Sequence, residues 1–99
     1  MVGEGLSNQI VVFTRELTSM SRKEGQIMVR AFGGHVQRAV SEKTTVLVRG
    51  SIGILQKTTE ELRVEYLRVR GIKIEVLNEQ EFLIRLNQEI VKQIHTSNW

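Results

Sequence analysis

The chain has 99 residues, of which 40% are hydrophobic and 25% charged, and a formal net charge of +3. This length suits one domain and excludes two, and the composition is that of a globular protein rather than a disordered or membrane-embedded one. The sequence contains neither cysteine nor aspartate, which excludes disulfides, thiolate metal sites and aspartate-dependent triads. Catalysis is therefore not expected, and the mildly basic charge permits nucleic acid as a partner without requiring it.

No apolar run approaches the roughly 20 residues that cross a bilayer, and no signal peptide precedes Ser7. We therefore expect no membrane partner. A single folded domain is predicted over residues 6–95, with flexible ends at 1–5 and 96–99.

Four segments have the pattern of strands. Residues 10–13 and 46–48 are continuously apolar, as is typical of strands buried on both faces of a parallel sheet. Residues 35–40 and 72–76 alternate polar and apolar side chains, as half-exposed strands do. The first pair is therefore predicted in the middle of the sheet and the second pair at its edges.

The first helix is predicted to open at Ser21, with Glu24 completing a capping box. It ends at a glycine pair, Gly33 and Gly34, since one glycine can adopt a positive φ and the other lets helix and strand approach closely. The helix therefore ends at Phe32 and the next strand begins two residues after the first glycine. Its expected apolar stripe consists of Ile27, Met28, Ala31 and Phe32.

Two further helices follow. One opens near Thr58 with Glu61 three residues on and ends at Gly71, and the other opens at Asn78 with Glu81. The first of them is expected to bury Leu62, Tyr66 and Val69, and the second Phe82, Leu83, Leu86 and Ile90, with Ile94 on an extension that would pass beyond the sheet and offer a surface to a partner.

The element order β-α-β-β-α-β-α predicts an α/β fold with a four-stranded parallel sheet. Right-handed crossovers place the strands in the order 2-1-3-4, with helices one and three on one face and helix two on the other. The chain reverses direction between strands one and three, and open α/β sheets bind ligands at the carboxyl ends of such strands. Thr14, Arg15 and the loop 49–57 are predicted there.

Two cations near this edge occupy positions that the helix dipole disfavours. Arg22 lies in the first turn of helix one, and Lys57 lies just before helix two. Helix N-termini attract anions, so cations placed there indicate a phosphate site beside Thr14. The alternative from the residues alone is two solvated basic side chains on a mixed surface.

Several short motifs occur in a fixed order along residues 7–87. They are VVFT at 11–14, SRKE at 21–24, FGG at 32–34, TTVLV at 44–48, Lys57, GIKI at 71–74 and EFL at 81–83. Together, in this register, they resemble the BRCT family, and the resemblance implies a three-layer fold with the sheet and helices described above. Residues 74–83 are most similar to the BRCT modules of bacterial NAD-dependent DNA ligases and of bacterial proofreading-type exonucleases.

The resemblance implies a phosphate pocket formed by the Thr14 hydroxyl, the next backbone N–H and Lys57. In the subset that binds 5′-phosphorylated DNA, typified by the replication factor C large subunit, an arginine at the position of Arg22 contributes. Arg15 departs from the family's usual glycine, and its side chain would either crowd a phosphate or add a charge to it. Phe82 replaces the tryptophan usual in tandem phosphopeptide-binding BRCT domains, a substitution common in ligase-type modules.

These features imply a non-catalytic binding module of DNA replication or repair, without a cofactor, that recognises phosphate on DNA, above all a 5′-phosphate end. Such a module would lie in the cytoplasm with the nucleoid of a bacterium, or in a eukaryotic nucleus. Alternatives are a module that binds a phosphopeptide or a protein, or an excised domain of a ligase or exonuclease. No metal site is expected, since His35 and His95 lack a third ligand, and Gly50 to Gly53 match the GxxG loop of KH domains only weakly.

Overall fold

The computed structural model describes residues 5–53 and 55–96, so the predicted flexible ends fall mostly outside the described residues, as does Trp99. The order of elements is the predicted one. The strands and helices are β1 (Ile10–Thr14), α1 (Arg22–Ala31), β2 (His35–Gln37), β3 (Val46–Arg49), α2 (Thr59–Val69), β4 (Glu75–Asn78) and α3 (Glu79–Thr96).

The strands form one parallel sheet in the order β2-β1-β3-β4, which confirms the predicted topology. Val12 of β1 lies opposite Gln37 on one side and Leu47 of β3 on the other. Val12 and Leu47 are both fully buried, because the two central strands are covered on both faces.

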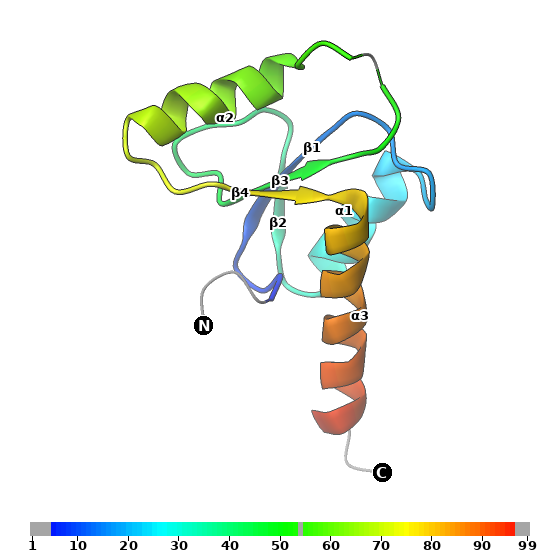
Figure 1. The fold of residues 1–99 in the computed structure, drawn as a ribbon. Helices are drawn as coiled ribbons and strands as arrows, with labels where there is room; N and C mark the ends of the chain where they lie inside the picture. The colour runs from blue at the N-terminus through cyan, green and yellow to red at the C-terminus, as the bar shows by residue number, and fades with distance from the viewer. Residues whose placement is uncertain (1–4, 54, 97–99) are drawn as a thin grey trace.

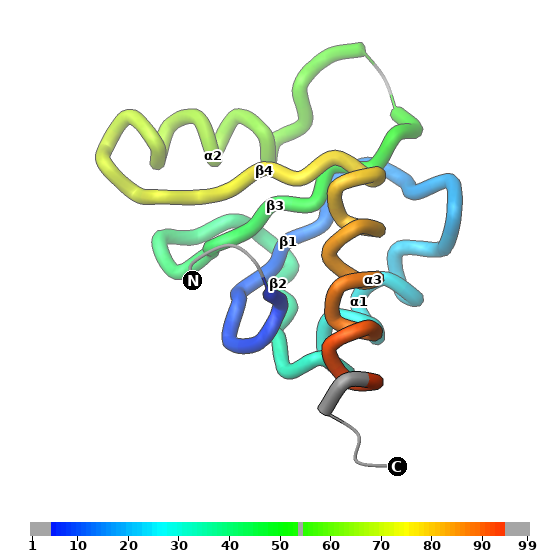
Figure 2. The backbone as a smooth tube through the Cα atoms, turned by 60° about the horizontal axis from the view of Figure 1, so that its bottom comes forward, coloured from blue at the N-terminus to red at the C-terminus, as the bar shows by residue number. Residues whose placement is uncertain are grey.

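Helices cover both faces of this sheet, with α1 and α3 on one side and α2 on the other (Figures 1 and 2). The larger core lies under α1 and α3, where the ring of Phe82 meets Phe13 edge to face at 5.4 Å. The smaller core lies under α2 and contains Val12, Val40, Leu47, Val64, Leu67 and Ile74. The predicted distribution of the helices is therefore confirmed.

The glycine pair ends α1 as predicted. Gly33 has a φ of 85°, and the N–H groups of Gly33 and Gly34 donate to the carbonyls of Arg30 and Val29 at 3.0 and 2.9 Å, a Schellman motif. A Cβ on Gly34 would lie 2.7 Å from Val29 Cγ1 and 2.8 Å from the carbonyl oxygen of Leu6. One glycine is therefore required for its conformation and the other for close packing.

The two edge strands differ from the predicted 35–40 and 72–76. β2 ends at Gln37, and Val40 packs into the core on the opposite face from Val36, which a continuous strand with its period of two does not allow. β4 begins only at Glu75, because the N–H of Ile72 donates to the carbonyl of Leu67 at 3.0 Å and closes the C-terminus of α2.

The buried face of α2 is not the predicted one. Glu61, Val64 and Leu67 face the sheet, whereas Leu62, Tyr66 and Val69 are exposed, and the guanidinium of Arg70 lies over the Tyr66 ring at 5.5 Å. At about 100° per residue, the two stripes lie on nearly opposite sides of the helix. The helix turns its Glu61 stripe inward because that carboxylate has arginine partners at the sheet edge.

The stripes of the other two helices are only partly as predicted. On α1, Gly25 and Val29 are buried, Met28 and Phe32 pack against the core, and Ile27 and Ala31 are exposed. Gly25 faces the sheet, where there is little room for a side chain, since a Cβ at this position would lie 3.0 Å from the Phe13 ring.

On α3, Phe82 and Leu86 are buried, whereas Ile90 and Ile94 are exposed. The last turns of α3 extend past the sheet (Figure 1). The asparagine cap is as predicted, since Asn78 Oδ1 accepts from the N–H of Glu81 at 2.8 Å.

Candidate phosphate-binding site

The carboxyl end of β1 meets the N-terminus of α2. Thr14 Oγ1 donates to Thr58 Oγ1 at 2.8 Å, and Thr58 is the N-cap of α2, where it forms the predicted capping box with Glu61. Thr14 is buried apart from 5% of its surface. The backbone of Lys57 therefore lies one residue from the contact that joins Thr14 to α2.

The loops after β1 and β3 lie against each other. Glu16 and Ile52 exchange two backbone hydrogen bonds of 3.0 Å, and the N–H of Gly50 donates to the carbonyl of Thr14 at 2.9 Å. A Cβ on Gly50 would lie 2.3 Å from the carbonyl oxygen of Glu16. Gly50 is therefore required by the close approach of two backbone segments, and the loop after β3 is paired with the loop after β1.

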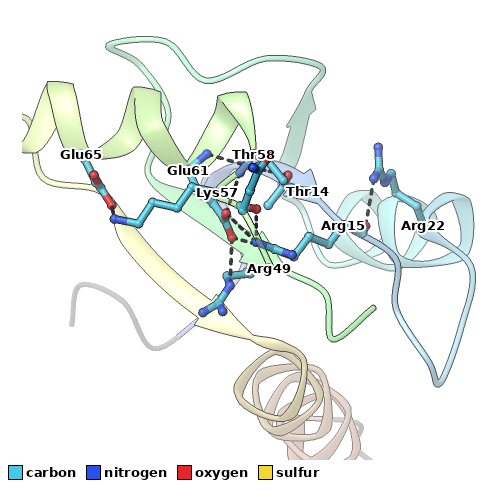
Figure 3. Close-up of polar contacts among 9 residues, drawn as sticks. Thr14, Arg15, Arg22, Arg49, Lys57, Thr58, Glu61 and Glu65 are labelled. Atoms are coloured by element: carbon cyan, nitrogen blue, oxygen red, sulfur yellow. Dashed lines mark hydrogen bonds and ion pairs between the residues drawn. The ribbon is translucent and has the colours of Figure 1, made fainter. Parts of the chain in front are cut away.

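Arg15 turns its side chain toward α2 (Figure 3). Its Nε and Nη2 atoms donate to the two oxygens of Glu61 at 2.9 Å each, and Nη2 also reaches the carbonyl of Gln56 at 3.0 Å. Only 9% of the side chain is exposed, and its φ is 64°, a left-handed conformation that favours glycine. Arg15 thus adopts a backbone conformation that glycine favours and uses its side chain to anchor the first turn of α2.

A second arginine, Arg49, contacts Glu61. The predicted loop 49–57 included it at this edge, but no role was predicted for it. Arg49 ends β3 opposite Thr14 in the sheet register, and its Nε lies 2.9 Å from Glu61 Oε2. Hydrogen bonds from Arg15 hold the pKa of Glu61 below its usual value, and the charge of Arg49 acts in the same direction. Glu61 is therefore ionised and fixed between two strands and a helix.

The two predicted cations point in different directions in this structure. Arg22 Nη2 donates to the carbonyl of Arg15 at 2.9 Å and lies 3.6 Å from the Glu16 carboxylate. Lys57 extends along α2 and pairs with Glu65, away from Arg22 (Figure 3). The structure thus brings Arg22 to the backbone beside Thr14, whereas the ammonium group of Lys57 lies on the far side of the α2 N-terminus.

A buried glutamate that the sequence analysis missed holds both loops to α3. Glu79 accepts hydrogen bonds of 2.7 to 2.9 Å from the N–H and hydroxyl groups of Thr18 and Ser19 and from the hydroxyl of Ser51. These bonds, the Ser19 hydroxyl foremost, hold the pKa of Glu79 well below its usual range, although burial alone would raise it. No local motif marks this residue, because its partners lie at least 28 positions away.

Acid is expected to weaken the fold through these two carboxylates. The pKa values of Glu79 and Glu61 are lower in the folded chain than in the unfolded chain, where glutamate titrates near about pH 4.3. Their stabilising effect is therefore present above that pH and is lost as the pH falls below it. Urea unfolding between about pH 7 and pH 3 should show this loss.

The matched variant is Glu79→Gln, which keeps the size of the side chain and removes its charge. We expect it to lower the free energy of unfolding at neutral pH by about 2 to 3 kcal/mol and to flatten the decline in acid. An unchanged decline in the variant would show that Glu79 does not titrate in this way.

Neither a metal centre nor a membrane span is found among the described residues. No group of three or more metal-ligating side chains occurs there, and no described helix is both long and apolar enough to cross a bilayer.

Comparison with known families decides the classification. The family model of the BRCA1 C Terminus (BRCT) domain matches residues 3–84. The chain belongs to the BRCT family. Its sheet order and its distribution of helices agree with that assignment, and the resemblance found in the sequence motifs is confirmed.

This BRCT chain is similar to parts of bacterial DNA ligases. It is 36% identical to the DNA ligase of Syntrophotalea carbinolica over 81 residues, which are 82% of this chain and 11% of the ligase. It is also 36% identical to the ligase of Geobacter sulfurreducens over 87 residues, 88% of this chain and 12% of the ligase. The chain thus spans about a tenth of the length of these curated relatives, and the similarity is confined to their BRCT region.

Proposed function

We propose that this BRCT domain is a non-catalytic module that binds phosphate on DNA, in the first place the phosphate of a 5′ end. Thr14, the N–H of Arg15, Arg22 and Lys57 would hold the phosphate. The observation that carries the proposal is the end of β1, where the Thr14 hydroxyl contacts the N-cap of α2 and Arg22, from the first turn of α1, donates to the carbonyl of Arg15. The N-terminus of α2 and the guanidinium of Arg22 both favour an anion beside Thr14.

Binding requires Lys57 to swing from Glu65 to the Thr14 side of the α2 N-terminus and exchanges two exposed ion pairs. A phosphate would replace Glu65 as the partner of Lys57 and Glu16 as the partner of Arg22. Exposed ion pairs of this kind contribute about 0 to 1 kcal/mol, so their exchange costs little. The Thr14 hydroxyl, which now donates to Thr58, would turn its hydrogen toward the phosphate, and Arg15 would remain on Glu61.

DNA is favoured as the carrier of the phosphate because the similar proteins are named DNA ligases. The net charge of +3 is compatible with this partner. This chain would then serve an activity located elsewhere, whether in the same polypeptide or in a partner of the repair machinery.

Binding of a phosphopeptide or protein is the second candidate, and it is favoured by exposed apolar side chains on two helices. Leu62, Tyr66 and Val69 lie on α2, and Ile90 and Ile94 lie on α3. Fluorescence anisotropy with a 5′-phosphorylated duplex, its unphosphorylated twin and a phosphothreonine peptide separates the candidates. Tighter binding of the phosphorylated duplex supports DNA, and preference for the peptide supports the second candidate.

A further inference from the structure

A cavity of about 280 Å³ lies beside the candidate phosphate site, between α2 and the strands β3 and β4. It shares Arg15 and Lys57 with that site, and Arg49 and Arg68 also line it. The acidic residues lining it are Glu61 and Glu65, so the four cations exceed the carboxylates by two positive charges. The cavity is therefore suited to an anion in addition to the one proposed at Thr14.

Arg49 is the residue best placed to bind that anion. It contacts Glu61 through Nε, and 54% of its side chain is exposed, so its terminal nitrogens can donate to a further acceptor. Glu61 itself is committed to Arg15 and to the N–H of Thr58. Arg49 is therefore held through Nε, and its two terminal nitrogens point away from Glu61 (Figure 3).

The position of Arg49 relates the cavity to the first phosphate. Arg49 and Thr14 are partners in neighbouring strands, which lie about 4.8 Å apart. Consecutive phosphates of one DNA strand rise about 3.4 Å along the helix axis and lie roughly twice that far apart through space. Because the arginine side chain is long, a strand whose terminal phosphate lay at Thr14 would place its next phosphate within reach of Arg49.

We propose that Arg49 binds the first internucleotide phosphate of the 5′-phosphorylated strand, making this cavity a second phosphate subsite. This inference rests on the proposed function, because it needs the terminal phosphate at Thr14. Arginine suits the role, since its planar guanidinium recognises phosphate through paired hydrogen bonds. Arg68 is held by the carbonyl of Ile74 at 2.8 Å and adds charge to the wall of the cavity.

A double-mutant cycle tests the subsite. Two 5′-phosphorylated duplexes are compared by fluorescence anisotropy at one salt concentration, one natural and one with a neutral methylphosphonate at the first internucleotide linkage. The wild type should bind the neutral duplex about ten-fold more weakly, and Arg49→Gln should bind the natural duplex more weakly by a similar factor. Arg49→Gln should then lose little more on the neutral duplex, because the contact is already absent.

Three controls define the result. Arg63→Gln also removes one positive charge, but from α2, where Arg63 lies 3.9 Å from Glu60 and does not line the cavity. This variant should keep the wild-type ratio between the affinities for the natural and the neutral duplex. Arg49→Lys keeps the charge and should retain part of the preference for the natural duplex over the neutral one. Thermal unfolding of Arg49→Gln checks that the loss of the Glu61 contact leaves the fold intact.

The failure of this inference can be told from that of the proposed function. If the wild type does not distinguish a 5′-phosphate from a 5′-hydroxyl, both fail. If it does, but the losses from Arg49→Gln and from the methylphosphonate are additive, only the second subsite is wrong. The second subsite would also be wrong if binding of a phosphothreonine peptide required Arg49 while binding of the duplex did not.

Discussion

Gly50→Ala is expected to lower the free energy of unfolding by about 3 kcal/mol, well above the roughly 1 kcal/mol of an ordinary substitution. The added Cβ would lie 2.3 Å from the carbonyl oxygen and 2.5 Å from the carbonyl carbon of Glu16. Backbone cannot yield as a side chain does, so the paired hydrogen bonds between Glu16 and Ile52 must break. Chemical denaturation measures the change directly.

Gly53→Ala is the matched control within the same motif. Its Cβ would lie 2.8 Å from Nη1 of Arg15, a side-chain atom that can shift further than backbone although it is hydrogen-bonded. We expect a loss well below that of the Gly50 variant. Equal losses for the two variants would mean that the close approach of the two loops is not what requires Gly50.

Lys57→Gln and Arg22→Gln are each expected to weaken binding to the 5′-phosphorylated duplex by about ten-fold or more, relative to its unphosphorylated twin. A charge-assisted hydrogen bond lost at a partly desolvated site costs about 1.5 to 3 kcal/mol. Both measurements need one salt concentration, because affinities for DNA at different salt concentrations cannot be compared. Glu65→Gln should instead strengthen binding to the 5′-phosphorylated duplex, since it releases Lys57 from its present partner.

Lys73→Gln controls for the loss of one positive charge. Lys73 precedes β4, at the opposite end of the sheet from Thr14, and its replacement should weaken both duplexes alike. If Lys57→Gln and Arg22→Gln also weaken both duplexes by the same factor, the two cations belong to a diffuse basic surface and the pocket does not exist.

The sheet was predictable because the relevant signals are local. The continuous apolar runs of β1 and β3 distinguish central from edge strands, and the positive φ of Gly33 with the close packing of Gly34 marks the turn after α1. The cap at Thr58 likewise identifies the start of α2. Each of these needs only a few neighbouring residues.

The buried face of α2 was not predictable from apolar periodicity. Two stripes, one containing Val64 and the other Leu62, are both compatible with a buried face, and the choice depends on Glu61. A glutamate is ordinarily assigned to solvent. Its burial here follows from Arg15 and Arg49, which reach it from two strands.

The candidate site shows the same division. The sequence placed Thr14 and Arg15 at the end of β1 and Lys57 at the start of α2, as the structure has them. The partners of the side chains could not be predicted from the sequence. Arg15 contacts a residue 46 positions away, and Glu79 accepts hydrogen bonds from two loops. Such contacts follow from topology and side-chain packing rather than from spacing.

The most direct test is the affinity of the wild-type domain for two duplexes that differ only in a 5′-phosphate. Fluorescence anisotropy at moderate, fixed salt reports both dissociation constants. The proposal predicts binding about ten-fold or more tighter with the phosphate, the equivalent of at least one charge-assisted contact. Equal affinity for the two duplexes, with the fold intact, would contradict it.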